Sequence, residues 1–152
     1  MAPRAAGLES ARMLLIALVA LHVAFDLVWI GSILSVAILL AAAAKDDDAG
    51  LARAALVVYR RLAVPSFAIA FLLGAARMSV DVMSYLHLHW FHGKLTLAIV
   101  VIALHHVIGA RAKKAAAGSM QAGRSGAILA VGLFSSVLLV TLLAVLKAAL
   151  VP

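Results

Sequence analysis

Four long apolar stretches, separated by short polar segments, most constrain how this chain folds. A helix that spans a bilayer needs about 20 consecutive, mostly apolar residues. The expected spans cover residues 13–44, 55–78, 92–112 and 125–147. Of the 152 residues, 66% are hydrophobic and 12% are charged, which is more apolar surface than a soluble domain of this size hides. We therefore predict an all-α polytopic membrane protein, with residues 1–152 forming one integral membrane domain, a four-transmembrane-helix bundle.

The basic residues lie mainly beside the predicted spans. The formal net charge is +7, and we attribute it to Lys and Arg that flank the spans, with no role in nucleic-acid binding. More of these residues lie on the side of the first and third connections than on the side of the termini. We therefore expect the side of the first and third connections to be the cytoplasmic side of a bacterial inner membrane. The first apolar stretch exceeds the roughly 7–15-residue core of a signal peptide, so we expect it to be retained.

Ionisable side chains lie inside two of the predicted spans. His22 and Asp26 are four residues apart in the first span and share a helix face with Trp29. His105 and His106 lie in the third span. An ionisable group in a bilayer costs roughly 2.5 kcal/mol or more, which makes each one a functional candidate. Asp26 is expected to accept the ring N–H of His22 or to be a separate proton site; the alternative is a structural polar pair that joins helices.

The two histidine-bearing spans run parallel, and their spacing suggests a shared ligand. His22 and His105 lie at depths that agree within one turn, counting about 1.5 Å per residue from the start of each span. Lys94 is three turns before His105 on the same face. Two neutral imidazoles at matched depth predict a haem iron ligated from both sides. The alternative is that the histidines of the third span pack against polar neighbours.

The connection between the second and third spans is rich in imidazole and thioether groups. These groups are Met78, Met83, His87, His89 and His92. Such ligands suit copper, although their spacing is no tight metal signature. The alternative is a polar membrane edge, in which Tyr85 and Trp90 act as interfacial anchors. The chain has no cysteine, which excludes disulfides, thiolate metal sites and covalent haem attachment.

Three segments of the chain resemble those of a known membrane family. They are His-Val-Ala-Phe-Asp-Leu-Val-Trp-Ile-Gly at 22–31, Tyr-Arg-Arg-Leu at 59–62 with Pro65 and Gly74 after it, and Trp-Phe-His-Gly-Lys at 90–94 with His-His and Gly-Ala-Arg at 105–111. They look like the first, second and third helices of HemJ-type protoporphyrinogen IX oxidases. The fourth span departs from that family, because its Asn-Glu-x-Pro segment is replaced by Gly-Arg-Ser-Gly at 123–126.

The resemblance implies a homo-oligomeric, haem b-binding membrane protein. It implies oxidation of protoporphyrinogen IX to protoporphyrin IX in haem biosynthesis, with a membrane electron acceptor. By position, His22 and His105 would hold the haem iron, and Lys94 and Arg61 would pair with substrate propionates. We add Asp26, which is unusual in the family's first helix, as a catalytic candidate. Two alternatives remain: a non-enzymatic b-type cytochrome that relays electrons, and a CopD-like copper transport or resistance protein.

Overall fold

The computed structural model describes residues 2–150, with side chains for 7–146 except those of 8 and 11. No β-strand occurs in this part of the chain. The elements, in order, are α1 (Ala2–Asp46), α2 (Ala49–Val58), the π-helical turn η1 (Tyr59–Ala63), α3 (Val64–Ser79), α4 (Val82–Leu86), α5 (His89–Ala116), the 3₁₀ turn η2 (Met120–Gly123) and α6 (Gly126–Leu150).

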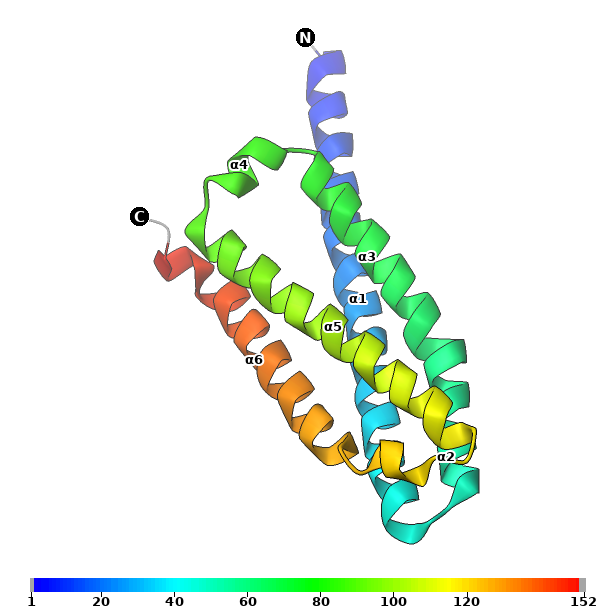
Figure 1. Cartoon of the computed structure of the whole chain (residues 1–152). Helices are drawn as coiled ribbons and strands as arrows, with labels where there is room; N and C mark the ends of the chain where they lie inside the picture. The colour runs from blue at the N-terminus through cyan, green and yellow to red at the C-terminus, as the bar shows by residue number, and fades with distance from the viewer. Residues whose placement is uncertain (1, 151–152) are drawn as a thin grey trace.

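Four helical segments of the described chain are long and apolar enough to cross a membrane. They are Arg12–Asp46, Ala49–Ser79, His89–Ala116 and Met120–Leu146. The prediction of an all-α four-helix bundle is confirmed, and the chain is a multi-pass membrane protein by the length and composition of these helices. In Figure 1, the start of α1, α4 and the end of α6 lie at one end of the bundle, and the α1–α2 turn and η2 lie at the other.

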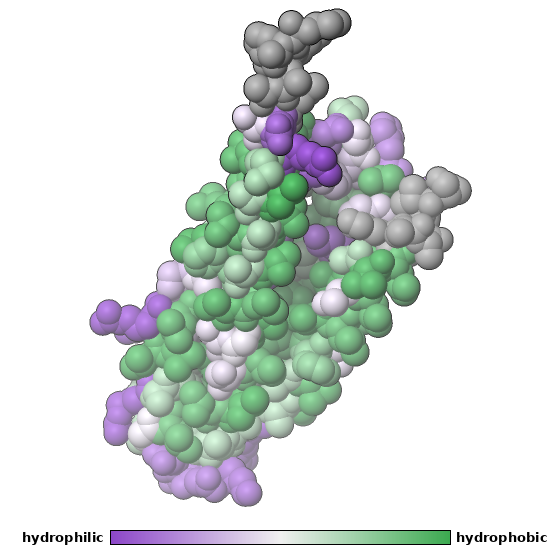
Figure 2. Space-filling view, turned by 180° about the vertical axis from the view of Figure 1, so that it is seen from behind, coloured by the Kyte–Doolittle hydropathy of each residue, from purple (hydrophilic) through white to green (hydrophobic). Residues whose placement is uncertain are grey.

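Hydrophobic side chains cover the middle of the bundle and hydrophilic ones gather towards its ends. Figure 2 shows this distribution on the rear face. Large apolar side chains such as Leu27, Leu72 and Ile128 point outwards, with 66–75% of their surface exposed. Such a surface is unfavourable in water, because removing apolar area from water lowers the free energy by roughly 25 cal/mol per Å². The exposed apolar middle is therefore suited to contact with lipid chains.

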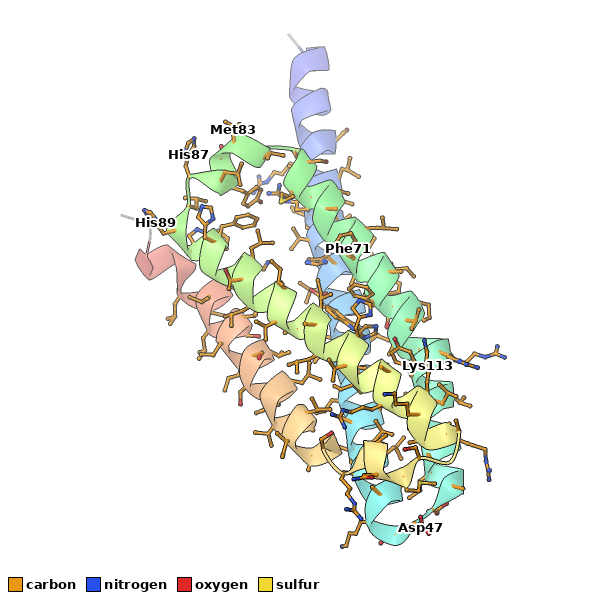
Figure 3. The ribbon with its side chains drawn as sticks, viewed as in Figure 1. Asp47, Phe71, Met83, His87, His89 and Lys113 are labelled. Atoms are coloured by element: carbon orange, nitrogen blue, oxygen red, sulfur yellow. The ribbon has the colours of Figure 1, made fainter. Side chains whose placement is uncertain are left out.

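A tight polar turn joins the first two spans. Asp47 directly follows α1 and has a left-handed backbone, at a φ of 50°. It lies at the end of the bundle opposite α4 (Figure 3). Asp48 then caps α2, because its carboxylate accepts hydrogen bonds from the backbone N–H groups of Gly50 at 2.6 Å and Leu51 at 3.1 Å. A carboxylate at this position satisfies backbone donors that the first helical turn leaves unpaired. The sequence Lys-Asp-Asp-Asp thus both stops one helix and starts the next.

The second span is continuous from Ala49 to Ser79, with one widened turn. In η1, the N–H of Val64 bonds to the carbonyl of Tyr59 five residues earlier, which is the π-helical pattern. Pro65 follows directly. Its ring lacks an N–H and crowds the carbonyl four residues before it. The wider turn therefore lets the helix pass Pro65 without breaking.

Small residues bring α6 close to α1 where the two helices meet near η2. A Cβ atom on Gly126 would lie 2.5 Å from the carbonyl oxygen of Ala37. Gly123 packs equally closely against the carbonyl of Leu40. Such small residues allow the backbones of membrane helices to approach. The fully buried Ile33, Leu40, Ile108 and Leu133 fill the core of this half of the bundle.

Candidate functional site

Three ionisable side chains of two spans form what we call the intramembrane polar cluster: His22 and Asp26 on α1, and Lys94 on α5. The Nε2 atom of His22 lies 3.3 Å from Oδ2 of Asp26. Lys94 is close enough to interact electrostatically with the carboxylate of Asp26. All three lie within membrane-spanning segments. Ionisable groups at such positions are costly and are usually found in functional sites.

Helix α3 fixes the orientation of the imidazole of His22. The Nδ1 atom lies 2.9 Å from the carbonyl oxygen of Ala70. A carbonyl only accepts hydrogen bonds, so Nδ1 carries a proton and donates it. Gly74, one turn further along α3, makes room for the ring, because a Cβ there would lie 2.9 Å from Cε1 of His22. The backbone of α3 therefore sets both the position and the tautomer of this histidine.

The bond to Ala70 also determines how His22 and Asp26 interact. When Nδ1 carries the proton of a neutral His22, Nε2 has a lone pair that faces Asp26. An ionised carboxylate also has only acceptor oxygens. Two acceptors 3.3 Å apart repel each other unless a proton lies between them. The pair is therefore built to hold one exchangeable proton, on Nε2 of His22 or on the carboxyl group of Asp26.

His105 occupies a different environment, enclosed by aromatic rings. It is 1% exposed, and its ring centroid lies 4.9 Å from that of Phe67 and 5.3 Å from that of Tyr59. The indole N–H of Trp29 lies 3.1 Å from its Nδ1 atom. Because an indole nitrogen only donates, Nδ1 of His105 accepts, and the neutral ring carries its proton on Nε2.

The structure does not bring all the expected site residues together. His22 is bonded beside Ala70, while His105 packs on Phe67, which lies three residues, or about 4.5 Å, from Ala70 along α3. Among the described side chains, no ring contact joins the two histidines. Arg61 is exposed in η1, nine residues before Ala70, and is thus about 13 Å away along the helix. His22, Asp26 and Lys94 meet, whereas His105 and Arg61 lie elsewhere.

The imidazole and thioether groups between the second and third spans lie around α4 and in the first turn of α5. Met83, His87 and His89 lie at and after α4, at the end of the bundle that holds the start of α1 (Figure 3). The Nε2 atom of His92 lies 2.8 Å from the carbonyl of Leu86 and donates to it. Within the residues described, no group of three or more His, Cys, Asp or Glu side chains is placed to hold a metal ion.

Comparison of the chain with protein-family models, with curated proteins and with solved structures finds no match. The functional conclusion therefore depends on the residues of this chain and their contacts.

Three partners in these sites were not expected from the sequence. The carbonyl of Ala70 carries no side-chain signal, so sequence reasoning had no means of finding it. Tyr59 and Phe67 look like ordinary apolar positions of the second span. Gly109, one turn after His105, gave a usable signal, because Tyr59 packs against it so closely that no Cβ fits. A glycine one turn from a buried histidine indicates that a bulky side chain comes close at that level of the helix.

Proposed function

We propose that the chain is a haem b-binding membrane oxidoreductase, similar to HemJ, that oxidises a porphyrinogen and passes the electrons to an acceptor in the membrane. The observation that carries this proposal is the hydrogen bond from Nδ1 of His22 to the carbonyl of Ala70. Histidines that ligate metals usually donate their second ring N–H to a carbonyl or carboxylate, which orients the ring and leaves the other nitrogen for the metal.

His22 is the residue that would hold the haem iron, because its Nδ1 is already bonded to the carbonyl of Ala70. Metal binding at an imidazole releases the proton from the ligating nitrogen, and Asp26 is the nearest acceptor for a proton that leaves Nε2. His105 fits this role less well, because the lone pair of its neutral ring is already used by Trp29. When bound, haem supplies one-electron redox chemistry whose potential depends on its axial ligand. We therefore assign the iron to His22 and a packing role to His105.

Lys94 and Asp26 supply the charges that a porphyrinogen substrate requires. The ammonium group of Lys94 suits a propionate carboxylate, with which it forms a charge-assisted hydrogen bond. Oxidation of the substrate removes hydrogen, so the electrons go to the acceptor and the protons go to a base. Asp26 is the base for these protons, because Nε2 of His22 is used by the iron in this proposal, and Lys94 lies within electrostatic range of Asp26. Binding and deprotonation thus use neighbouring side chains.

Haem binding is tested with the purified full-length protein. We expect the protein to carry b-type haem and to show its Soret absorption band. His22→Ala should remove this band. His106→Ala is the matched control, because His106 is exposed and adjacent to the buried His105. His105→Ala should keep the band if the variant folds. A band that is unchanged in His22→Ala, or no band in the wild-type protein supplied with haem, contradicts the assignment.

Oxidase activity is tested by porphyrin fluorescence in membranes supplied with protoporphyrinogen IX. A charge-assisted hydrogen bond is worth about 1.5–3 kcal/mol, so Lys94→Gln should slow the reaction roughly 10- to 100-fold. Lys94→Glu should abolish it, because it repels a propionate. Lys113→Gln removes the same charge from an exposed position of α5 and should have no effect. Bound haem without porphyrin formation in the wild type would favour the electron-relay function instead.

A further inference from the structure

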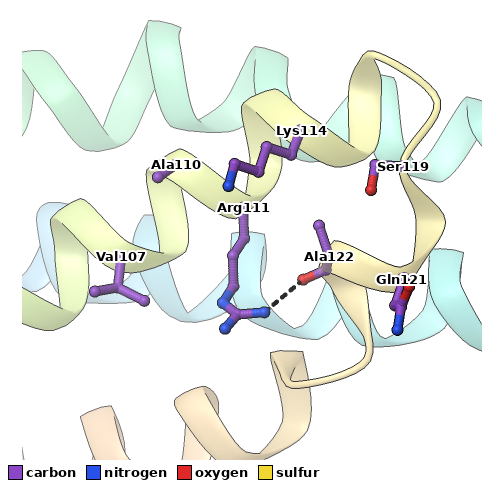
Figure 4. Close-up of a pocket in the computed structure, with 7 residues that line it drawn as sticks. All are labelled: Val107, Ala110, Arg111, Lys114, Ser119, Gln121 and Ala122. Carbon is purple, nitrogen blue, oxygen red and sulfur yellow. Dashed lines mark hydrogen bonds between the residues drawn. The ribbon is translucent and has the colours of Figure 1, made fainter.

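A concave site lies at the end of the bundle opposite α4, between the last turns of α5 and the loop that contains η2. Its volume is about 410 Å³, and Figure 4 shows the side chains that line it. Arg111 and Lys114 reach it from α5, and Ser119 and Gln121 from the loop. The guanidinium group of Arg111 is held in place, because its Nη1 donates to the carbonyl of Ala122 at 3.2 Å.

The two cations of this site lack a negative partner. Among the side chains that the structure describes, neither Arg111 nor Lys114 forms an ion pair. They are three residues apart on one helix face, where like charges repel each other. The loop adds the hydroxyl of Ser119 and the amide of Gln121, which are hydrogen-bond donors. A concave site with two unpaired cations and neutral donors is complementary to an anion.

The apolar part of the lining identifies the kind of anion. Val107 and Ala110 form the side of the site towards the membrane-spanning part of α5, and Val107 is exposed on the surface of the bundle. A ligand in this position meets polar groups at the membrane surface and apolar groups towards the bilayer interior. Basic pockets between membrane helices commonly bind the headgroups of anionic lipids.

We propose that this site binds an anionic phospholipid. Its phosphate diester lies between Arg111 and Lys114, its acyl chains run past Val107, and a hydroxyl-bearing headgroup such as that of phosphatidylglycerol meets Ser119 and Gln121. This site lies apart from the intramembrane polar cluster and does not depend on the function proposed for that cluster.

Lys113 provides a matched control on the same helix turn. It is exposed and does not line the site, and it has the same charge and the same favourable position near a helix C-terminus as Lys114. Removing either charge therefore changes the interaction with the helix dipole equally. Only the loss of Lys114 changes the proposed lipid site.

Native mass spectrometry of the full-length protein tests the proposal, by titration with phosphatidylglycerol or with phosphatidylcholine of the same acyl chains. We expect preferential binding of phosphatidylglycerol. Each cation near an anionic lipid contributes about 1 kcal/mol, so Lys114→Gln should weaken binding about fivefold. Adding Arg111→Gln should weaken it about 25-fold, and Lys113→Gln should leave it unchanged. Circular dichroism checks that the variants are helical.

Three results overturn the proposal. One is equal binding of both lipids by the wild-type protein. Another is equal affinity for phosphatidylglycerol in Lys114→Gln and Lys113→Gln; the single variant keeps this test valid even where the double variant fails to fold. The third is displacement of the lipid by inorganic phosphate alone, which identifies the ligand as a free phosphate.

Discussion

The contact between Gly109 on α5 and the ring of Tyr59 sets how closely two spans approach at the level of His105. A Cβ atom at position 109 would overlap three atoms of the Tyr59 side chain, namely the ring carbons Cζ and Cε2 and the hydroxyl oxygen Oη. The ring has little room to move, because Tyr59 is 6% exposed and packs on His105. Gly109→Ala must therefore push α5 away or displace the aromatic rings around His105.

The expected cost follows from two opposing effects. Overpacking of a tight core costs about 1–3 kcal/mol, and overlap with three ring atoms lies at the high end of that range. Alanine is favoured over glycine in a helix by about 1 kcal/mol. We therefore expect Gly109→Ala to lower the free energy of unfolding by about 2 kcal/mol. For a chain of this size, this corresponds to a fall in Tm of roughly 4–8 °C.

Thermal unfolding in detergent, followed by circular dichroism, measures this change. The control is Gly132→Ala, because a Cβ on Gly132 on α6 meets no atom within 4 Å; it should be neutral or stabilise the protein. In a Tyr59→Ala background the overlapping ring is absent, so Gly109→Ala should then behave like the control. If Gly109→Ala and Gly132→Ala have the same Tm in the wild-type background, α5 and the second span are not in such close contact.

Two further changes test individual hydrogen bonds. Trp29→Phe removes the N–H that bonds to His105. It should lower the free energy of unfolding by about 1 kcal/mol and shift the Nδ1 signal of His105 in the ¹⁵N NMR spectrum. An unmoved signal would rule out this bond. Hydrogen bonds from Ser84, first from its side chain and then from its backbone, lower the pKa of Asp81 from 3.8. The cap of α4 is therefore fully formed above pH 3.8 and is lost as the pH falls through the lowered pKa of Asp81. Faster amide exchange at Ser84 should report this loss. Asp81→Asn, which keeps a good cap, should remove the pH dependence.

The sequence was sufficient to predict the four spans, for a simple physical reason. Burial in a bilayer requires a long, uninterrupted apolar segment, and the polar break at residues 45–50 separates the first two segments clearly. Local details were harder to predict. Hydropathy shows how long an apolar segment is. It does not show the hydrogen-bond pattern inside the helix, so it does not predict the widened turn at Tyr59–Ala63. Pro65 lies just after this turn, and the helix continues past it.

The candidate site was predictable only in part, because residue counting assumes that spans stand parallel. Lys94 and His105 were expected to act at one site, with His22 at the depth of His105. In the structure α5 crosses α1 obliquely (Figure 1). Counting residues from the start of each helix therefore does not show which side chains of different spans are in contact. Lys94 lies near Asp26, while His105 reaches Trp29, seven residues beyond His22 on α1 and about 10 Å along its axis.

His22 and His105 show why residue type alone does not decide the role of a histidine in a membrane span. Both have an imidazole inside the bundle, yet their Nδ1 atoms have opposite roles. The carbonyl of Ala70 makes Nδ1 of His22 a donor, which leaves Nε2 free to exchange a proton with Asp26 or to bind a metal. The indole of Trp29 makes Nδ1 of His105 an acceptor, which uses the lone pair that a metal needs. The neighbouring helix therefore sets the tautomer of each histidine, through a single hydrogen bond in each case.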